Sequence, residues 1–261
     1  MSYTTFLVTV LVIAMIAGLV VGSFLNVCIG RIPQGDSIVR PASRCPACLS
    51  PIRWYQNVPV VSYLALRGHC AACRAAISFR YPLIELLTGL LFVYVTWTFG
   101  IGWPTFIYWV FVAMLVVITF IDLDHQIIPN VISLPGIALG FLSSFLVPWI
   151  TWSDSLLGIA LGGGSLWLVA VLYALIAKAE GMGMGDVKLL AMIGAFLGYQ
   201  AILPVVLLSS FSGAFVGLMA MAGQGKGRKY AIPFGPFLSL GALVYLFWGD
   251  FLVSWYFTLF Q

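Results

Sequence analysis

The sequence predicts an all-α fold, a polytopic membrane helix bundle of about eight transmembrane helices with one small extramembrane loop module. Three observations support this prediction. Of the 261 residues, 62% are hydrophobic and only 8% are charged, whereas a soluble domain has about 25% charged residues. The mean hydropathy is +1.09. The apolar residues also gather in runs long enough to cross a bilayer, which takes about 20 residues of helix.

The first apolar run begins near the N-terminus and continues to about Val27. Residues Met1–Thr5 carry no basic side chain, so we interpret this run as a retained first helix rather than a signal peptide. The run 187–222 is too long for one span, and Gly198–Gln200 and Pro204 indicate a break within it. The predicted spans are 5–28, 82–100, 104–121, 131–148, 155–177, 187–200, 201–222 and 232–250.

The basic residues lie in or beside three of the predicted loops, which all emerge on one face of an eight-helix bundle. The positive-inside rule makes that face cytoplasmic, and both termini should then lie on the opposite side. Segments 122–130 and 178–186 should face the cytoplasm, as should a module over 29–81. The basic residues are Arg31, Arg40, Arg44, Arg53, Arg67, Arg74 and Arg80 in the first loop, Lys178 and Lys188 flanking the second, and Lys226, Arg228 and Lys229 in the third.

Four cysteines in the module form two Cys-x-x-Cys pairs, Cys45 with Cys48 and Cys70 with Cys73. This spacing predicts a tetrahedral tetrathiolate zinc site. The loop has few large apolar residues, so metal binding would supply the free energy for its folding. Four thiolates leave no open coordination position, and the metal is therefore expected to be structural.

Other interpretations of these cysteines are two disulfides or an iron–sulfur cluster. A reducing cytoplasm disfavours the disulfides. The fifth cysteine, Cys28, is expected to be a small buried hydrophobic residue. His69 could replace a ligand, although an ordinary loop histidine is the simpler interpretation because four cysteines already complete the set.

Two acidic segments lie at the ends of predicted spans, Asp122–Asp124 and the glycine-rich Gly181–Asp186. Each alone has an ordinary interpretation. The first could be a solvated interfacial turn, and the second could be a turn in which Asp186 is the N-cap of the next helix. A dinucleotide-binding loop is excluded because no strand precedes the glycines.

Brought together, the two segments would form a water-activating pair. Two carboxyl groups within hydrogen-bonding distance share a proton, because both cannot easily ionise. The ionised group can take a proton from water while the protonated group polarises a peptide carbonyl. Gly183 and Gly185 would let a substrate backbone approach closely, since no Cβ intervenes. The sequence therefore predicts a proteolytic site at Asp122 and Asp186, with Asp124 as an alternative partner.

The segment Gly183–Asp186 matches the motif of the GxGD aspartyl proteases, and nearly the whole chain resembles the bacterial type IV prepilin peptidases. Several separate motifs carry the resemblance in the same order. They are Gly22–Val27 with Arg31 and Pro33, the four cysteines, Asn57–Val60, Leu66–Gly68, Arg80–Pro82, Glu85–Gly89, Ile121–Asp124, Lys188–Leu190 and Ile232–Pro236.

The resemblance implies a bifunctional enzyme. It would cut the basic leader peptide from type IV prepilins or pseudopilins and then methylate the new N-terminal amine with S-adenosylmethionine. Asp122 and Asp186 would be catalytic, and Gly68 occupies a position that the family associates with methylation. The chain departs from the family at Asn130, where many members have Asp, and at His69, where Lys or Arg often follows the glycine.

The expected organisation is a first transmembrane helix over 1–28, a cytoplasmic zinc-binding module over 29–81 and a transmembrane aspartyl peptidase domain over 82–261. The resemblance places the chain in the cytoplasmic (inner) membrane as a multi-pass protein whose active site and zinc loop face the cytoplasm. Expected partners are the lipid bilayer and prepilins or pseudopilins of a type IV pilus, a type II secretion system or a competence system, and no nucleic acid.

Two functions from other classes also fit an acid-bearing membrane bundle, a proton-coupled transporter and a non-catalytic pilus or secretion assembly subunit. A transporter would place its acids at mid-membrane depth, whereas these acids lie at loop junctions. An assembly subunit would tolerate loss of both acids. Glu85 opens the second predicted span, where it either stabilises the helix N-terminus or contacts the leader peptide.

Overall fold

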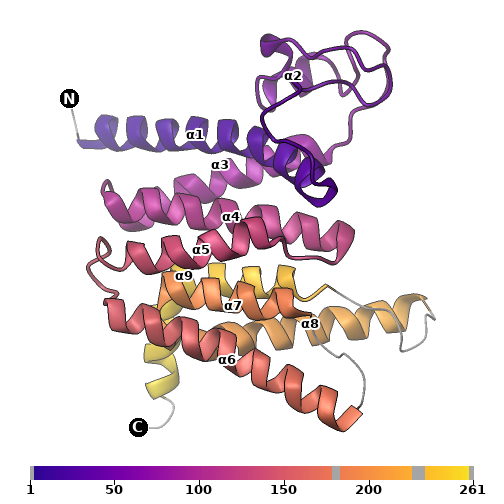
Figure 1. The fold of residues 1–261 in the computed structure, drawn as a ribbon. Coiled ribbons are helices and arrows are strands. Elements are labelled where there is room, and N and C mark those ends of the chain that lie inside the picture. Colours follow the sequence, from indigo (N-terminus) through magenta and orange to yellow (C-terminus); the bar gives the residue numbers. More distant parts are fainter. Residues whose placement is uncertain (1–2, 178–182, 225–232, 259–261) are drawn as a thin grey trace. The chain divides into compact units, whose positions relative to one another are not determined.

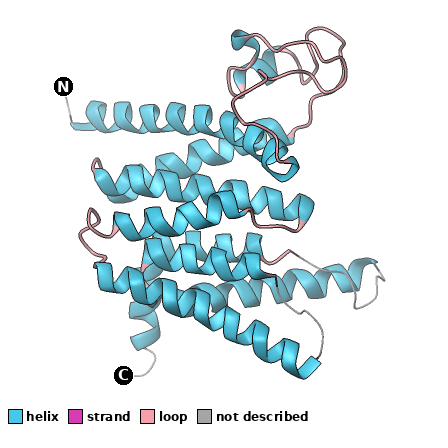
Figure 2. Cartoon of the chain, in the orientation of Figure 1, coloured by secondary structure: helices cyan, strands magenta, loops and turns pink. Residues whose placement is uncertain are grey.

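The computed structural model describes residues 3–177, 183–224 and 233–258, and their regular structure is helical (Figure 2). The long helices are α1 (Tyr3–Arg31), α3 (Arg80–Phe99), α4 (Trp103–His125), α5 (Asn130–Ser143), α6 (Trp152–Ala177), α7 (Met184–Leu197), α8 (Ile202–Gln224) and α9 (Gly235–Thr258) (Figure 1). Short helices are η1 (Ile32–Gln34), η2 (Trp54–Gln56), α2 (Val61–Ala65) and η3 (Tyr199–Ala201). The all-α prediction is confirmed.

Within the described ranges, six of the helices (α1, α3, α4, α6, α8 and α9) are long and apolar enough to cross a membrane. Helices α5 and α7 have 14 residues each. At 1.5 Å per residue such a helix is about 21 Å long, short of a hydrocarbon core of about 30 Å. The predicted order of eight helices is therefore correct, but two of them are shorter than a full span.

Helices α5 and α7 have identifiable C-terminal ends. The prediction extended α5 to residue 148, but it ends at Ser143, where the hydroxyls of Ser143 and Ser144 donate hydrogen bonds to carbonyls of the last turn. Helix α7 ends at Leu197, and the next residue, Gly198, has a φ of 79°, which favours glycine. The predicted break in the run 187–222 is confirmed there.

The chain divides within α4 into two compact units, residues 1–117 and 118–261. In the first unit, α1 packs closely on α3. A Cβ at Gly18 would lie 2.7 Å from Cα of Gly89, and one at Gly22 would lie 2.7 Å from Cα of Glu85. Small residues allow this close approach of two membrane helices. The functional division at residues 28 and 81 stays a prediction.

In the second unit, α7 is the core helix. Leu189, Leu190, Met192 and Ile193 are fully buried, and α5, α6 and α9 pack around them. Gly194 of α7 touches the backbone of α6. Because α7 is enclosed in this way, Asp186 in its first turn is held at one end of a well-packed core.

Several sequence positions lie outside the described residues. They are Lys178, Gly181, Met182, Lys226, Arg228, Lys229 and Ile232. The predictions of loop orientation that rest on these basic residues are therefore not addressed by the structure.

Candidate active site and metal centre

Asp122 lies in the last turn of α4 and is only 5% exposed. The helix continues to His125, so Asp122 is inside the helix and not in the turn beyond it, where the sequence had placed it. Its Oδ2 accepts a 2.9 Å hydrogen bond from the backbone N–H of Gly235, the first residue of α9. The first N–H groups of a helix have no partner within the helix and favour an anionic acceptor. The start of α9 thereby holds the Asp122 carboxylate.

Asp186 is the third residue of α7, which is not one of the six helices long enough to span a membrane. The N-cap is Gly183, so the N-cap interpretation of Asp186 is wrong. The pKa of the Asp186 carboxyl is raised to about 6. Burial is the larger cause, and the charge of Asp122 is the smaller one. The two predicted acids thus lie in the same unit, close enough for the charge of Asp122 to act on Asp186. Asp124 is exposed.

Ile128, between α4 and α5, packs against the start of α7 and the start of α9. A Cβ at Gly185 would lie 2.9 Å from Cβ of Ile128. A Cβ at Gly235 would lie 3.3 Å from Cδ1 of Ile128 and 2.6 Å from Oδ2 of Asp122. Gly185 and Gly235 therefore have packing reasons to lack a side chain. Beside Gly183, by contrast, the nearest atom to an added Cβ is Oδ2 of Asp186, at 3.9 Å.

Sequence reasoning assigned no role to Ile128 or Gly235. The signal for Gly235 was its place before Pro236 at the start of an apolar run, which is typical of a helix N-terminus. Nothing in the sequence pointed to Ile128. A further contact joins α5 and α7, because Nζ of Lys188 donates a 2.8 Å hydrogen bond to Oδ1 of Asn130. The side chain at position 130 therefore has a structural partner.

The four cysteines of the module converge, since their Sγ atoms all lie within 4.8 Å of one another. All four are free thiols, so the disulfide interpretation is wrong. Cys45 is buried and Cys73 is exposed, and their Sγ atoms are 3.9 Å apart. This arrangement can hold a metal ion.

The two cysteine pairs sit on matching turns. The N–H of Leu49 donates to the Cys45 carbonyl, and the N–H of Arg74 donates to the Cys70 carbonyl. Both donors, four residues after the first cysteine of each pair, have positive φ, at 58° and 60°. An isolated β-bridge closes each turn, between Arg44 and Pro51 and between His69 and Ala76. Two separate turns thus present their thiols to the same point.

Three further predicted positions lie in or near this module. Gly68 has a φ of 71°, and a Cβ there would lie 3.1 Å from the hydroxyl of Tyr63, so two constraints favour glycine. His69 Nδ1 is 2.7 Å from the Arg67 carbonyl, as expected of a loop histidine. Cys28 is buried in α1, as expected.

Glu85 lies beyond the first turn of α3, so the prediction that it stabilises that helix N-terminus is wrong. Its side chain is 8% exposed, and its Oε2 accepts a 2.8 Å hydrogen bond from the N–H of Val60. Ser23 of α1 also hydrogen-bonds to it. Val60 has φ 60° and ψ −48°, which is rare for a β-branched residue. Glu85 thereby ties α1 and α3 to a strained turn of the module.

Comparison with known proteins gives matches along most of the chain. Residues 16–99 match the family model described as the bacterial peptidase A24 N-terminal domain, and residues 109–218 match that of the type IV leader peptidase family.

Three curated relatives share the name prepilin leader peptidase/N-methyltransferase. The one from Stutzerimonas stutzeri is 40% identical over 93% of this chain and 92% of its own length. The one from Pseudomonas aeruginosa is 40% identical over 89% and 88%. The one from Myxococcus xanthus is 44% identical over 81% and 63%. No solved structure gives a significant match.

Proposed function

The chain belongs to the type IV leader peptidase family, and we propose that it cleaves the basic leader peptide from type IV prepilins or pseudopilins and then N-methylates the new N-terminus. The relatives' names support both activities. The observation that best supports the peptidase is that Asp122, at the end of α4, and Asp186, at the start of α7, lie close enough for the charge of Asp122 to raise the pKa of Asp186.

In the proposed cleavage, Asp122 is the base and Asp186 holds the proton. The N–H of Gly235 donates to Oδ2 of Asp122 and favours its charged form. The pKa of Asp186 is raised to about 6, which favours a bound proton there. Asp122 takes a proton from water as the water oxygen bonds to the scissile carbonyl carbon, and Asp186 donates its proton to the carbonyl oxygen. When the carbon–nitrogen bond breaks, the leaving amine takes the proton from Asp122, and one hydroxyl of the tetrahedral intermediate returns a proton to Asp186, which leaves the new carboxylic acid. Gly183, which is exposed, leaves room beside Asp186 for the substrate backbone.

Methyl transfer would use S-adenosylmethionine as the methyl donor. The deprotonated amine forms a bond to the methyl carbon, and the bond from that carbon to the sulfonium sulfur breaks with its electron pair left on sulfur. The nitrogen then releases one proton. This step needs a bound donor and an accessible mature N-terminus.

We propose zinc as the metal of Cys45, Cys48, Cys70 and Cys73. Zinc–sulfur bonds of about 2.3 Å at tetrahedral angles separate thiolates by about 3.8 Å, and the Cys45–Cys73 separation of 3.9 Å fits this value. A tetrathiolate zinc is closed to substrate, so it would stabilise the module and take no part in proteolysis.

We place the site at the cytoplasmic face of the inner membrane. Two features support this placement. The first loop is basic, and the positive-inside rule assigns such a loop to the cytoplasm. Both aspartates also lie at helix ends. A prepilin that inserts by its apolar helix would leave its leader on that side, so the scissile bond would lie at the membrane surface.

The test is leader cleavage of a purified prepilin in detergent by Asp122→Asn and Asp186→Asn, with Asp124→Asn as the matched control. We expect each of the first two variants to lose cleavage by a factor of about 10³ or more, by analogy with other catalytic acids and bases. The control should cleave at the wild-type rate. If Asp122→Asn cleaves normally and Asp124→Asn does not, the assigned pair is wrong.

A further inference from the structure

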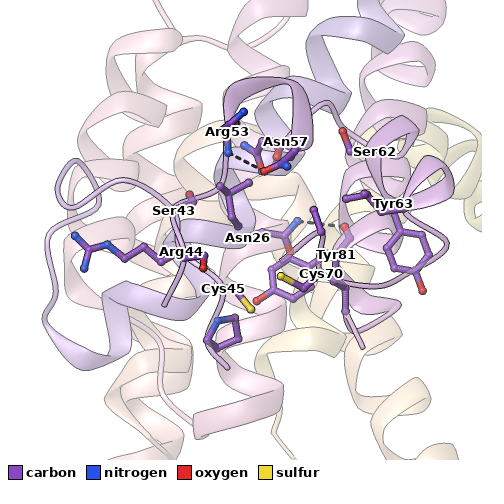
Figure 3. A pocket seen from close by; sticks show the side chains of 18 of the residues that line it. Asn26, Ser43, Arg44, Cys45, Arg53, Asn57, Ser62, Tyr63, Cys70 and Tyr81 are labelled. Carbon is purple, nitrogen blue, oxygen red and sulfur yellow. Dashed lines mark hydrogen bonds between the residues drawn. The ribbon is translucent and has the colours of Figure 1, made fainter. Parts of the chain in front are cut away.

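The first unit contains a cavity of about 880 Å³ between the C-terminal part of α1, the cysteine module and Glu85 of α3. Small-molecule sites typically have about 300–1,000 Å³, with a few polar groups among apolar ones. Figure 3 shows Cys45 and Cys70 on one side of the cavity and Arg53 and Asn57 on the other, with Asn26 and Tyr81 between them. Neither aspartate of the proposed peptidase lines it.

Glu85 is the one acidic side chain among the residues that line this cavity. It is buried, and in the described part of the chain its hydrogen bonds come from neutral groups, the Val60 N–H and Ser23. A buried carboxylate without a cationic partner is costly unless something compensates its charge. A positively charged ligand group in the cavity would provide that compensation.

The same cavity also contains groups that can bind a carboxylate, a hydrogen-bond donor and an aromatic base. Arg31 and Arg53 line it and can bind a carboxylate. Among the described residues, the side chain of Asn26 makes two hydrogen bonds, both donated by Nδ2, to the carbonyls of Gly22 and Tyr81, and its Oδ1 can accept a hydrogen bond from a ligand. The ring of Tyr81 gives a flat surface against which a base can stack.

We propose that this cavity binds S-adenosylmethionine, with its cationic end at Glu85 and its carboxylate at Arg31 or Arg53. The inference rests on the methyl transfer proposed above and adds where the donor binds. S-adenosylmethionine carries a sulfonium, an ammonium, a carboxylate and an adenine, and the cavity contains a complementary group for each kind. A basic leader peptide, which Glu85 could also attract, lacks the adenine.

The test is calorimetric titration of the full-length, zinc-loaded protein in detergent with S-adenosylmethionine. Glu85→Gln keeps the shape and an acceptor for the Val60 N–H but removes the charge, and we expect Kd to rise about thirtyfold or more. Asp36→Asn, an exposed acid of the same module that does not line the cavity, is the matched control and should bind as the wild type does.

A second variant guards against misfolding of Glu85→Gln. Gly30 lines the cavity, and no atom lies within 4 Å of the position its Cβ would take. Gly30→Leu should therefore fold, retain its zinc and weaken the binding of S-adenosylmethionine about tenfold or more. The equally open Gly164, in α6 of the other unit, gives the control Gly164→Leu, which should not change binding.

The outcomes distinguish failure of the cavity assignment from failure of the proposed methyl transfer. Wild-type binding that neither variant weakens overturns the cavity assignment and leaves methyl transfer standing. Loss of leader-peptide binding in Glu85→Gln with unchanged S-adenosylmethionine binding overturns the assignment in favour of the leader. A wild-type protein that cleaves prepilin but neither binds S-adenosylmethionine nor transfers its methyl group overturns both proposals about methylation, while the peptidase remains.

Discussion

Gly235 positions the carboxylate of Asp122, the proposed catalytic base, although it has no side chain. Its N–H donates to Oδ2 of Asp122 at 2.9 Å, and the space where a Cβ would sit is filled by that same oxygen and by Ile128. The hydrogen bond and the close contact both need the backbone of α9 at this place. A larger residue would have to displace the Asp122 carboxylate from its present position.

We therefore expect Gly235→Ala to lower leader cleavage about a hundredfold, because a displacement of about 1 Å at reacting groups can have that effect. The matched control is Gly213→Ala in α8, where an added Cβ meets Phe237 at an ordinary 3.5 Å. The measurement is kcat on a purified prepilin, with a thermal melt to check folding. A fully active Gly235→Ala would show that this contact does not position Asp122.

The pKa of Asp186 gives a second test at the residue scale. Burial is the larger cause of its rise to about 6, and the charge of Asp122 is the smaller one. Asp122→Asn should thus lower the pKa of Asp186 but leave it above the ordinary 3.8, because the burial remains. Titration of ¹³C-labelled aspartate carboxyl groups by NMR measures the change. An unchanged or higher pKa would mean that the two groups are not neighbours.

At the scale of elements, the position of Asp186 depends on how α7 packs on α6. Gly158 of α6 touches the backbone of Gly194, and a Cβ at Gly162 would lie 2.6 Å from the Leu190 carbonyl oxygen. Glycine normally weakens a helix by about 1 kcal/mol relative to alanine. Here the close approach of the two helices requires it.

Two substitutions in α6 separate the close packing of the two helices from the helix propensity of glycine. Gly158→Ala must push α7 away and should lower the melting temperature. Gly164→Ala, which meets open space in the same helix, should leave it unchanged or raise it slightly, because alanine favours helix. A melting curve of each variant in the same detergent checks this, and equal melting temperatures would contradict the described packing.

The cysteine module is the other element that can be tested alone. Its two turns are joined through the metal position, while both aspartates belong to the second unit. Removal of the metal by a chelator should disorder the module and abolish methyl transfer, with leader cleavage still measurable. The checks are metal content, proteolysis of the module and both activities. Immediate and complete loss of cleavage would contradict a purely structural metal.

At the scale of the whole molecule, much of the architecture could be predicted because membrane helices follow hydropathy. The eight long helices occur in the predicted order, and the Cys-x-x-Cys spacing identified the four thiols that converge. Local pattern could also locate Asp122 and Asp186, since each lies at the end of an apolar run.

What the sequence could not give were contacts between distant segments. The bond from Gly235 to Asp122 joins residues 113 positions apart, and the bond from Val60 to Glu85 depends on how the module folds back on α3. Helix lengths also differed, because Asp122 lies within α4 and α5 ends early. Tertiary packing decides these features, and hydropathy does not report it.

The central claim is that Asp122 and Asp186 activate one water molecule as a unit, and a double-mutant cycle tests it most directly. The measurement is the rate of leader cleavage by the wild type, Asp122→Asn, Asp186→Asn and the double variant under identical conditions. Residues that act as a unit are strongly non-additive, so the double variant should be no slower than the slower single variant. Losses that multiply in the double variant, or a single variant that cleaves at the wild-type rate, would contradict the claim.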